Sequence, residues 1–225
     1  MLTIGYGACT GCSRLTSLEI SSGVTTIGGD RMFEGCESLK SVVIPPSVCT
    51  MEGHPFEGWH GHLVINSPSF SYENDVLIDE NKNAIIAFRS KVKSYVVPPT
   101  VTSIGDGAFA GCSSLTSIVL PSSVTSIGES AFFGCSGLTS IEIPFGVTSI
   151  GNYAFYGCKG LTSVTISESV KSIGYSAFYV CLSLTSIVVR SRVLSIATGA
   201  FYDCGNLDDS SRMEMQRRFG ENVVD

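Results

Sequence analysis

All three histidines of this 225-residue chain fall within nine residues, at His54, His60 and His62. Imidazole nitrogens bind zinc and copper well, and the thiol of Cys49 or the carboxylate of Glu57 would supply a further ligand. In an extended chain, however, a His-x-His segment points its two rings to opposite faces. The segment therefore leaves metal binding open as one function of the protein, without defining a complete ligand set.

Nine cysteines offer thiol chemistry, and most of them occupy one repeated position. Cys12 and Cys36 share this position with five cysteines spaced 23 residues apart, which are Cys112, Cys135, Cys158, Cys181 and Cys204. An unpaired cysteine behaves as a small buried hydrophobe, so we predict that these side chains pack in a core. Chain segments stacked about 4.8 Å apart would also place successive thiols within disulfide range, and a ladder of disulfides is the alternative.

The residues of the common enzymatic motifs are not assembled in this sequence. Its serines are numerous, but none stands in a Gly-x-Ser-x-Gly turn with a placed histidine and acid. No glycine-rich phosphate-binding loop is present, and the carboxylates are dispersed along the chain rather than paired. We therefore predict a protein that is not an enzyme and that uses no cofactor.

A row of aromatic side chains recurs at the same interval. Most of them follow a core phenylalanine directly, and two further tyrosines enlarge the row, so that its members are Phe133, Tyr153, Tyr156, Tyr175, Tyr179 and Tyr202. An exposed row of this kind can stack on sugars or dock a partner protein. The alternative is that neighbouring rings about 4.8 Å apart pack only on one another.

Short β-branched segments predict a second surface. In residues 115–120, apolar side chains alternate with Ser117 and Val119 in the pattern of a half-buried strand, and Pro121 ends it. The equivalent outward positions of eight predicted strands are Glu19, Val43, Val64, Val96, Val119, Glu142, Thr165 and Val188. These strands predict one continuous parallel ladder. Its outer face suits a flat partner, and the polar residues of that face are Glu19, Glu142 and Thr165. The alternative is a surface shielded by its own serines and threonines.

All of these residues belong to one repeated unit of 23 residues. Its anchor isoleucines are Ile104, Ile127, Ile150, Ile173 and Ile196, and its core phenylalanines are Phe109, Phe132, Phe155, Phe178 and Phe201. One unit cannot bury enough apolar surface to fold alone, so the units must stack around a shared core as a solenoid. Beside the strand, we expect a second extended segment at 124–127 and a tight helical corner from Gly128 to Gly134.

The histidine segment departs most from this unit. Pro55 and Trp59 stand where the other repeats have alanine and cysteine. The alternative to a metal site is therefore a shortened coil that is filled by the indole of Trp59.

Two further segments stand outside the regular pattern. Residues 76–78 and 84–88 predict a β-hairpin, which belongs to an insert within residues 66–94. After Leu207 the pattern stops, and Asp209–Ser211 with Glu214 predicts a capping box that opens a helix through Phe219. The sequence thus divides into a repeat solenoid at 1–207 and a carboxy-terminal cap helix and tail at 208–225.

Composition limits the kinds of partner. The chain has a formal net charge of -6, its lysines and arginines are scattered, and no apolar run approaches the length of a membrane span. We therefore expect neither nucleic-acid binding nor insertion into a membrane.

The repeated unit resembles the BspA-like leucine-rich repeats, also called the Treponema pallidum type. The resemblance is carried by segments 126–128, 131–135 and 138–141, which recur in phase along almost the whole chain. It implies an α/β repeat fold that is predominantly β: a right-handed, curved leucine-rich-repeat solenoid with a parallel strand ladder. It also implies export or display at the cell surface, and a role in adhesion or in binding a protein or glycan.

The first residues fall in register with the middle of a later unit, since 1–5 matches 124–128. They show no secretion signal, and we expect an upstream segment that is missing from this sequence. Three functions follow for testing: a noncatalytic extracellular or cell-surface module that binds a protein or glycan, a metal-binding protein, or a structural spacer that displays other domains.

Overall fold

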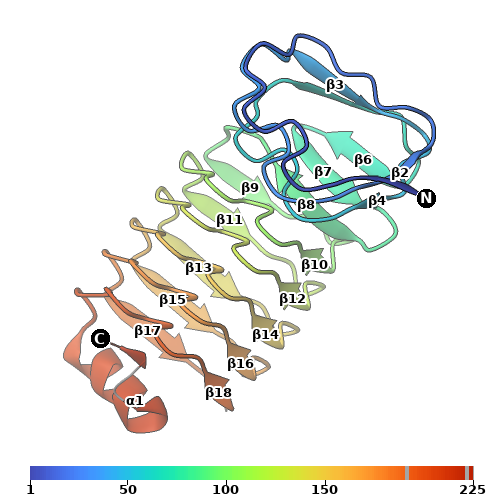
Figure 1. Cartoon of the computed structure of the whole chain (residues 1–225). Coiled ribbons are helices and arrows are strands. Elements are labelled where there is room, and N and C mark those ends of the chain that lie inside the picture. The colour runs from blue at the N-terminus through green and yellow to red at the C-terminus, as the bar shows by residue number, and fades with distance from the viewer. Residues whose placement is uncertain (191–192, 221–222, 225) are drawn as a thin grey trace. The chain divides into compact units, whose positions relative to one another are not determined.

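Stacked coils, each built from short strands joined by turns, make up most of this protein, and one helix follows them (Figure 1). The computed structural model describes residues 1–190, 193–220 and 223–224, and the chain divides into two units, Met1–Arg89 and Ser90–Asp225. The predicted fold, a predominantly β solenoid with parallel strands, is confirmed. The boundary between the units falls inside the segment 66–94 that the sequence assigns to an insert.

The second unit contains two parallel ladders, one on each side of its coils (Figure 1). In one ladder, each strand pairs with the strand one repeat away; its members are β10 (Ser103–Ile104), β12 (Ser126–Ile127), β14 (Ser149–Ile150), β16 (Ser172–Ile173) and β18 (Ser195–Ile196). The other ladder comprises the pair β9 (Ser94–Val96) and β11 (Ser117–Val119) and the sheet β13 (Ser140–Ile143), β15 (Ser163–Ile166) and β17 (Ser186–Val189). The second extended segment of each unit is thus a short strand of its own.

The first unit contains parallel strands and an antiparallel insert. Its parallel strands are β1 (Leu2–Ile4), β2 (Val24–Ile27) and β4 (Thr50–Met51) in one sheet, and β3 (Ser41–Ile44) with β5 (His62–Ile65) in another. The predicted hairpin is confirmed as β7 (Val76–Asp79) and β8 (Ala84–Phe88). The sequence interpretation missed a third strand of the insert, β6 (Phe70–Glu73), which pairs antiparallel with β7.

Two local predictions were wrong. Glu19 lies in a segment without strand structure, and the strands predicted as one continuous ladder form separate pairs and a triple. The predicted helical corner is a series of turns, because Ser130 and Gly134 have positive φ angles of 54° and 68°, which an α-helix does not accept.

The core of the second unit is a column of phenylalanines. Phe109, Phe132, Phe155, Phe178 and Phe201 are all fully buried. Successive ring centroids lie 4.9–5.0 Å apart, with the planes within 14° of parallel. Beside them, Cys135, Cys158, Cys181 and Cys204 are buried and Cys112 is half-buried, and all nine cysteines of the chain are free thiols. The coils therefore share one interior, to which each contributes a ring and a thiol.

Helix α1 (Asp209–Phe219) follows the last coil. Its N-cap is Asp208, whose carboxylate accepts a 2.7 Å hydrogen bond from the backbone N–H of Ser211. The predicted capping box is therefore wrong in its position, and Glu214 instead forms ion pairs with Arg217 and Arg218. Met215 is buried, as are Val223 and Val224 beyond the helix, so this segment covers apolar surface as expected of a cap.

Candidate functional site

The predicted aromatic row lies on the turns that join the two ladders of the second unit. We call its six members the aromatic stripe: Phe133, Tyr153, Tyr156, Tyr175, Tyr179 and Tyr202. Phe133 stacks on Tyr156 with ring centroids 4.9 Å apart, and Tyr156 stacks on Tyr179 at 5.2 Å, both pairs within 8° of parallel. Tyr202 continues the row at 6.4 Å from Tyr179, with a tilt of 42°.

The two additional tyrosines widen the stripe through edge contacts. The ring of Tyr153 meets Tyr156 at 6.1 Å and Tyr175 at 5.5 Å, with interplanar angles of 62° and 81°. The structure therefore brings all six predicted residues into one connected surface, which combines a stacked row with edge-on contacts.

The stripe is a surface feature rather than part of the core. Phe133 is 38% exposed and Tyr175 is 47% exposed, whereas the phenylalanine column behind them is fully buried. Because inner ring faces cover one another, the stacked members present mainly their edges and hydroxyl groups outward. A hydrogen bond with the carboxylate of Asp203 raises the pKa of Tyr179, since the protonated phenol is the form that donates it.

Left-handed backbone conformations recur at two positions of these turns, and Tyr153 and Val180 hold them with bulky side chains. Tyr153 has a φ of 55°, at a position where two coils have glycine and the other two have Ser130 and Ser176 with φ angles of 54° and 51°. Val180, next to Tyr179, has a φ of 59° where other coils have glycine, as at Gly157. A bulky or β-branched residue in the left-handed region is an outlier, although the conformation itself is a feature of the repeated turn.

The predicted strand face is only partly assembled. Thr165 of β15 pairs with Glu142 of β13 on one side and with Val188 of β17 on the other. Glu19 belongs to the first unit and lies outside its strands. The threonines that flank the face are occupied within the fold, because the hydroxyl groups of Thr139 and Thr162 donate to backbone carbonyls one coil away.

The three histidines do not converge. His54 is half-buried beside Asp30, with 3.8 Å between Nε2 and a carboxylate oxygen, while His60 and His62 are exposed. Across residues 1–190, 193–220 and 223–224, no three or more histidine, cysteine, aspartate or glutamate side chains are grouped so that they could hold a metal ion.

The segment around Trp59 is a shortened coil. Cys36 and Trp59 occupy the same core position in consecutive coils, and Val42 pairs with Leu63. Six residue steps separate Cys36 from Val42, but only four separate Trp59 from Leu63. The indole is buried, and its Nε1 donates a 3.0 Å hydrogen bond to the carbonyl oxygen of Leu39. A Cβ atom at residue 61 would lie 2.2 Å from the indole, so the contact requires Gly61.

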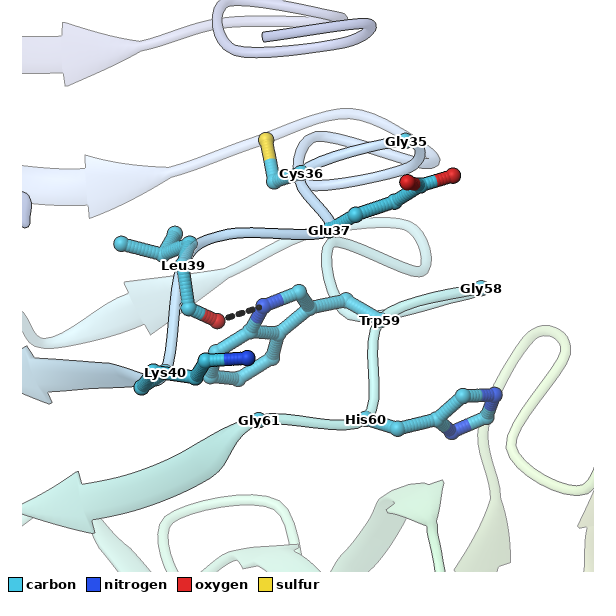
Figure 2. Close-up of a pocket in the computed structure, with 9 residues that line it drawn as sticks. All are labelled: Gly35, Cys36, Glu37, Leu39, Lys40, Gly58, Trp59, His60 and Gly61. Atoms are coloured by element: carbon cyan, nitrogen blue, oxygen red, sulfur yellow. Dashed lines mark hydrogen bonds between the residues drawn. The ribbon is translucent and has the colours of Figure 1, made fainter. Parts of the chain in front are cut away.

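The shortening leaves a pocket of about 410 Å³ at the surface of the first unit (Figure 2). Its lining comprises Gly35, Cys36, Glu37, Leu39, Lys40, Gly58, Trp59, His60 and Gly61. Figure 2 shows the imidazole of His60 extending away from the indole. The sequence interpretation missed this pocket, although the two-residue deficit between Trp59 and Leu63 was available as its signal.

Comparison with known proteins identifies the repeated unit. The model of the BspA type leucine rich repeat region matches in six copies over residues 2–74 and 84–208. No curated protein sequence matches significantly.

Several solved structures resemble the chain. A leucine rich cell surface protein from Faecalibacterium prausnitzii is 28% identical, with a TM-score of 0.62 over 83% of this chain and 56% of its own length. A leucine rich repeat protein from T. pallidum is 25% identical, with a TM-score of 0.57 over 90% of this chain and 81% of its own. A leucine-rich repeat protein from Eubacterium ventriosum, at 24% identity, shares the fold, with a TM-score of 0.74 over 92% of this chain and 68% of its own.

The chain thus spans little more than half the length of the F. prausnitzii protein. The family model, by contrast, covers most of the chain, including the coils that share the phenylalanine column. The chain therefore belongs to the BspA type leucine rich repeat family.

Proposed function

We propose that this protein is a noncatalytic recognition module that binds another protein through the aromatic stripe. The observation that carries the proposal is the connected row of surface aromatic rings on consecutive turns. Tyrosine suits protein interfaces because it offers large contact area, loses little conformational freedom and adds a hydroxyl group. Such residues are enriched among those that dominate binding energy.

The arrangement of the rings favours a protein partner over a glycan. Sugars stack on open aromatic faces, but the faces of Tyr156 are covered by Phe133 and Tyr179. The outward edges and phenolic hydroxyl groups instead suit contacts with side chains and backbone groups of a protein.

Two further features support this reading. The repeated turn requires left-handed backbone at two positions, and bulky Tyr153 and Val180, in the stripe or beside it, occupy them where other coils have serine, aspartate or glycine. The carboxylates of the neighbouring coils, Asp106, Glu129 and Glu142, stand in different turns or strands and form no acid–base pair in a pocket. We place the site of action outside the cell, as for the cell surface protein that the chain resembles.

A binding screen with matched variants tests the proposal. The purified protein is applied to immobilised extracellular matrix proteins and to a glycan array, alongside Tyr156→Ala and Tyr179→Ala. We expect binding to at least one protein, and we expect each substitution to weaken it by about 10-fold or more. Phe145→Ala is the control, because Phe145 is 67% exposed but lies outside the stripe.

Three other outcomes of this screen would favour a different function or a different contact surface. Binding to glycans alone, weakened by the same substitutions, would favour the glycan alternative. Binding that survives both tyrosine substitutions would move the contact surface away from the stripe. Uniform lack of binding would favour a structural spacer.

A further inference from the structure

The aromatic stripe ends abruptly at Phe133. One face of its ring lies against Tyr156, but the preceding coil carries Ala110 at the equivalent position. Ala110 carries only a methyl group, and a Cβ atom built on the adjacent Gly111 meets nothing within 4 Å. The outer face of Phe133, which is 38% exposed, is therefore an end face of the stack that no ring of the stripe covers.

The two coils that carry Ala110 and Phe133 contain acidic side chains and no basic ones, and the nearest lysines in the sequence are Lys93 and Lys159. Residues 94–158 contain no lysine, arginine or histidine, and their charged side chains are Asp106, Glu129 and Glu142. Asp106 and Glu129 belong to the two turns that carry Ala110 and Phe133, and both are exposed. The turns are joined by a 2.8 Å hydrogen bond from the backbone N–H of Glu129 to Asp106.

A ring face on turns that also carry exposed carboxylates fits a planar cation. A guanidinium group can stack flat on the ring while its N–H groups pair with a carboxylate, whereas a lysine ammonium group lacks the planar fork. The chain contains this contact elsewhere: the guanidinium carbon of Arg89 lies 4.9 Å from the ring centroid of Trp59, and that of Arg218 lies 4.9 Å from Phe219. The same distance separates Phe133 from Tyr156, so a guanidinium would occupy the next step of the stack.

We propose that Phe133, together with Asp106 and Glu129, forms a binding site for an arginine side chain of a basic partner protein. The inference rests on the proposed function of the stripe and specifies the chemistry of its partner. It assigns a role to the interruption of the row at Ala110, which leaves the face of Phe133 accessible.

Titration with a fluorescein-labelled peptide, alternating three arginines with glycines, tests the inference by fluorescence anisotropy. Peptides with lysine or with neutral citrulline at the same positions are the comparisons. We expect the arginine peptide to bind more tightly than the citrulline peptide by about 2- to 30-fold, the range of a cation–π contact, and the lysine peptide, which lacks the planar fork, to bind more weakly than the arginine peptide.

Three variants locate the contact. Phe133→Ala removes the ring, and Ala110→Phe covers its face with another ring while both carboxylates remain. Asp106→Asn removes one charge but keeps the oxygen that caps Glu129, as Asn152 does for Tyr175 in another coil. We expect each substitution to weaken binding of the arginine peptide several-fold and to bring its affinity closer to that of the lysine peptide. Phe145→Ala should leave the affinity unchanged.

Equal binding of the arginine and lysine peptides, or full binding by Ala110→Phe, would overturn the inference. Its failure is separable from that of the proposed function. If Tyr179→Ala abolishes binding to a matrix protein while Ala110→Phe retains it, the stripe is the interface and the arginine site is wrong. If neither substitution changes binding to that protein, both proposals fail.

Discussion

The thiol of Cys158 donates a hydrogen bond to the carbonyl oxygen of Phe132 in the preceding coil, with 3.2 Å between sulfur and oxygen. Cys135, Cys181 and Cys204 make the same contact to Phe109, Phe155 and Phe178 at 3.0–3.3 Å. The repeated cysteine therefore does more than fill volume, because its S–H group links consecutive coils beside the phenylalanine column.

Buried thiols of this kind should be chemically inert in the folded protein. Burial raises the pKa of Cys112 and Cys158 to about 12, and it also raises the pKa of Cys135. We expect an aromatic disulfide reagent at pH 8 to modify the exposed Cys12 and Cys49 rapidly and the other seven cysteines only slowly. Counting released thiolate spectroscopically, before and after adding denaturant, checks this.

The double substitution Cys12→Ser and Cys49→Ser is the control and should remove the rapid phase. Rapid modification of five or more thiols in the native protein would contradict a closed core.

The same pKa shifts predict loss of stability at alkaline pH. Below the ordinary thiol value of 9.0, folded and unfolded chains both hold these protons. As the pH rises from 9 towards 12, the unfolded chain releases them while the folded chain retains them, so the free energy of unfolding decreases. The urea midpoint of the unsubstituted protein should fall steadily between pH 8 and pH 11. The midpoint of Cys158→Ala should fall less steeply over the same range. A midpoint that is flat across this range would refute the linkage.

The strained backbone at Val180 predicts a stabilising substitution. Its φ of 59° suits glycine, so Val180→Gly should raise the free energy of unfolding by about 1 kcal/mol. The reverse exchange, Gly157→Val, places the same side chain on a φ of 70° in the preceding coil, where the nearest atom is 3.8 Å from the added Cβ. It should lower stability by about 1–2 kcal/mol. Urea unfolding of both variants compares the two, and a loss of stability in Val180→Gly would disprove the assignment of strain.

Trp59 should act as a structural plug of the shortened coil. Trp59→Phe removes the hydrogen bond to Leu39 and leaves a buried carbonyl oxygen without that partner, which should cost about 1–3 kcal/mol. His60→Ala changes an exposed neighbour in the same segment and should cost less than about 0.5 kcal/mol. Thermal unfolding followed by circular dichroism distinguishes them, and a larger effect at His60 would argue that the histidine segment has another role.

Much of the fold could be predicted because the repeat encodes it redundantly. Five copies of the phenylalanine and cysteine positions fix the core, and the β-branched segments fix the strands on either side. The aromatic stripe could be predicted for the same reason, since a residue next to Phe155 must point away from the core that Phe155 enters.

The remaining features depend on single residues and on local geometry. Asp208 competes with Ser211 as a helix cap, and only the backbone hydrogen bond from Ser211 decides between them. Glu19 has the strand pattern but no strand pairing in the structure. The sequence shows that the row stops at Ala110, but it does not show which ring face this leaves uncovered. The stacking distances in the structure identify that face.

The central claim is that the aromatic stripe serves contact with a partner, while the phenylalanine column behind it serves stability. Phe178 and Tyr179 are adjacent in sequence, but Phe178 is fully buried in the column and Tyr179 lies in the stripe.

Urea unfolding of Phe178→Ala and Tyr179→Ala, followed by circular dichroism, tests this claim directly. Phe178→Ala should lose about 3–5 kcal/mol of unfolding free energy, as large-to-small core substitutions do. Tyr179→Ala should lose about 1 kcal/mol or less, the value of an aromatic pair at the surface. Equal losses in the two variants would contradict the account, because they would show that the stripe is part of the stabilising core.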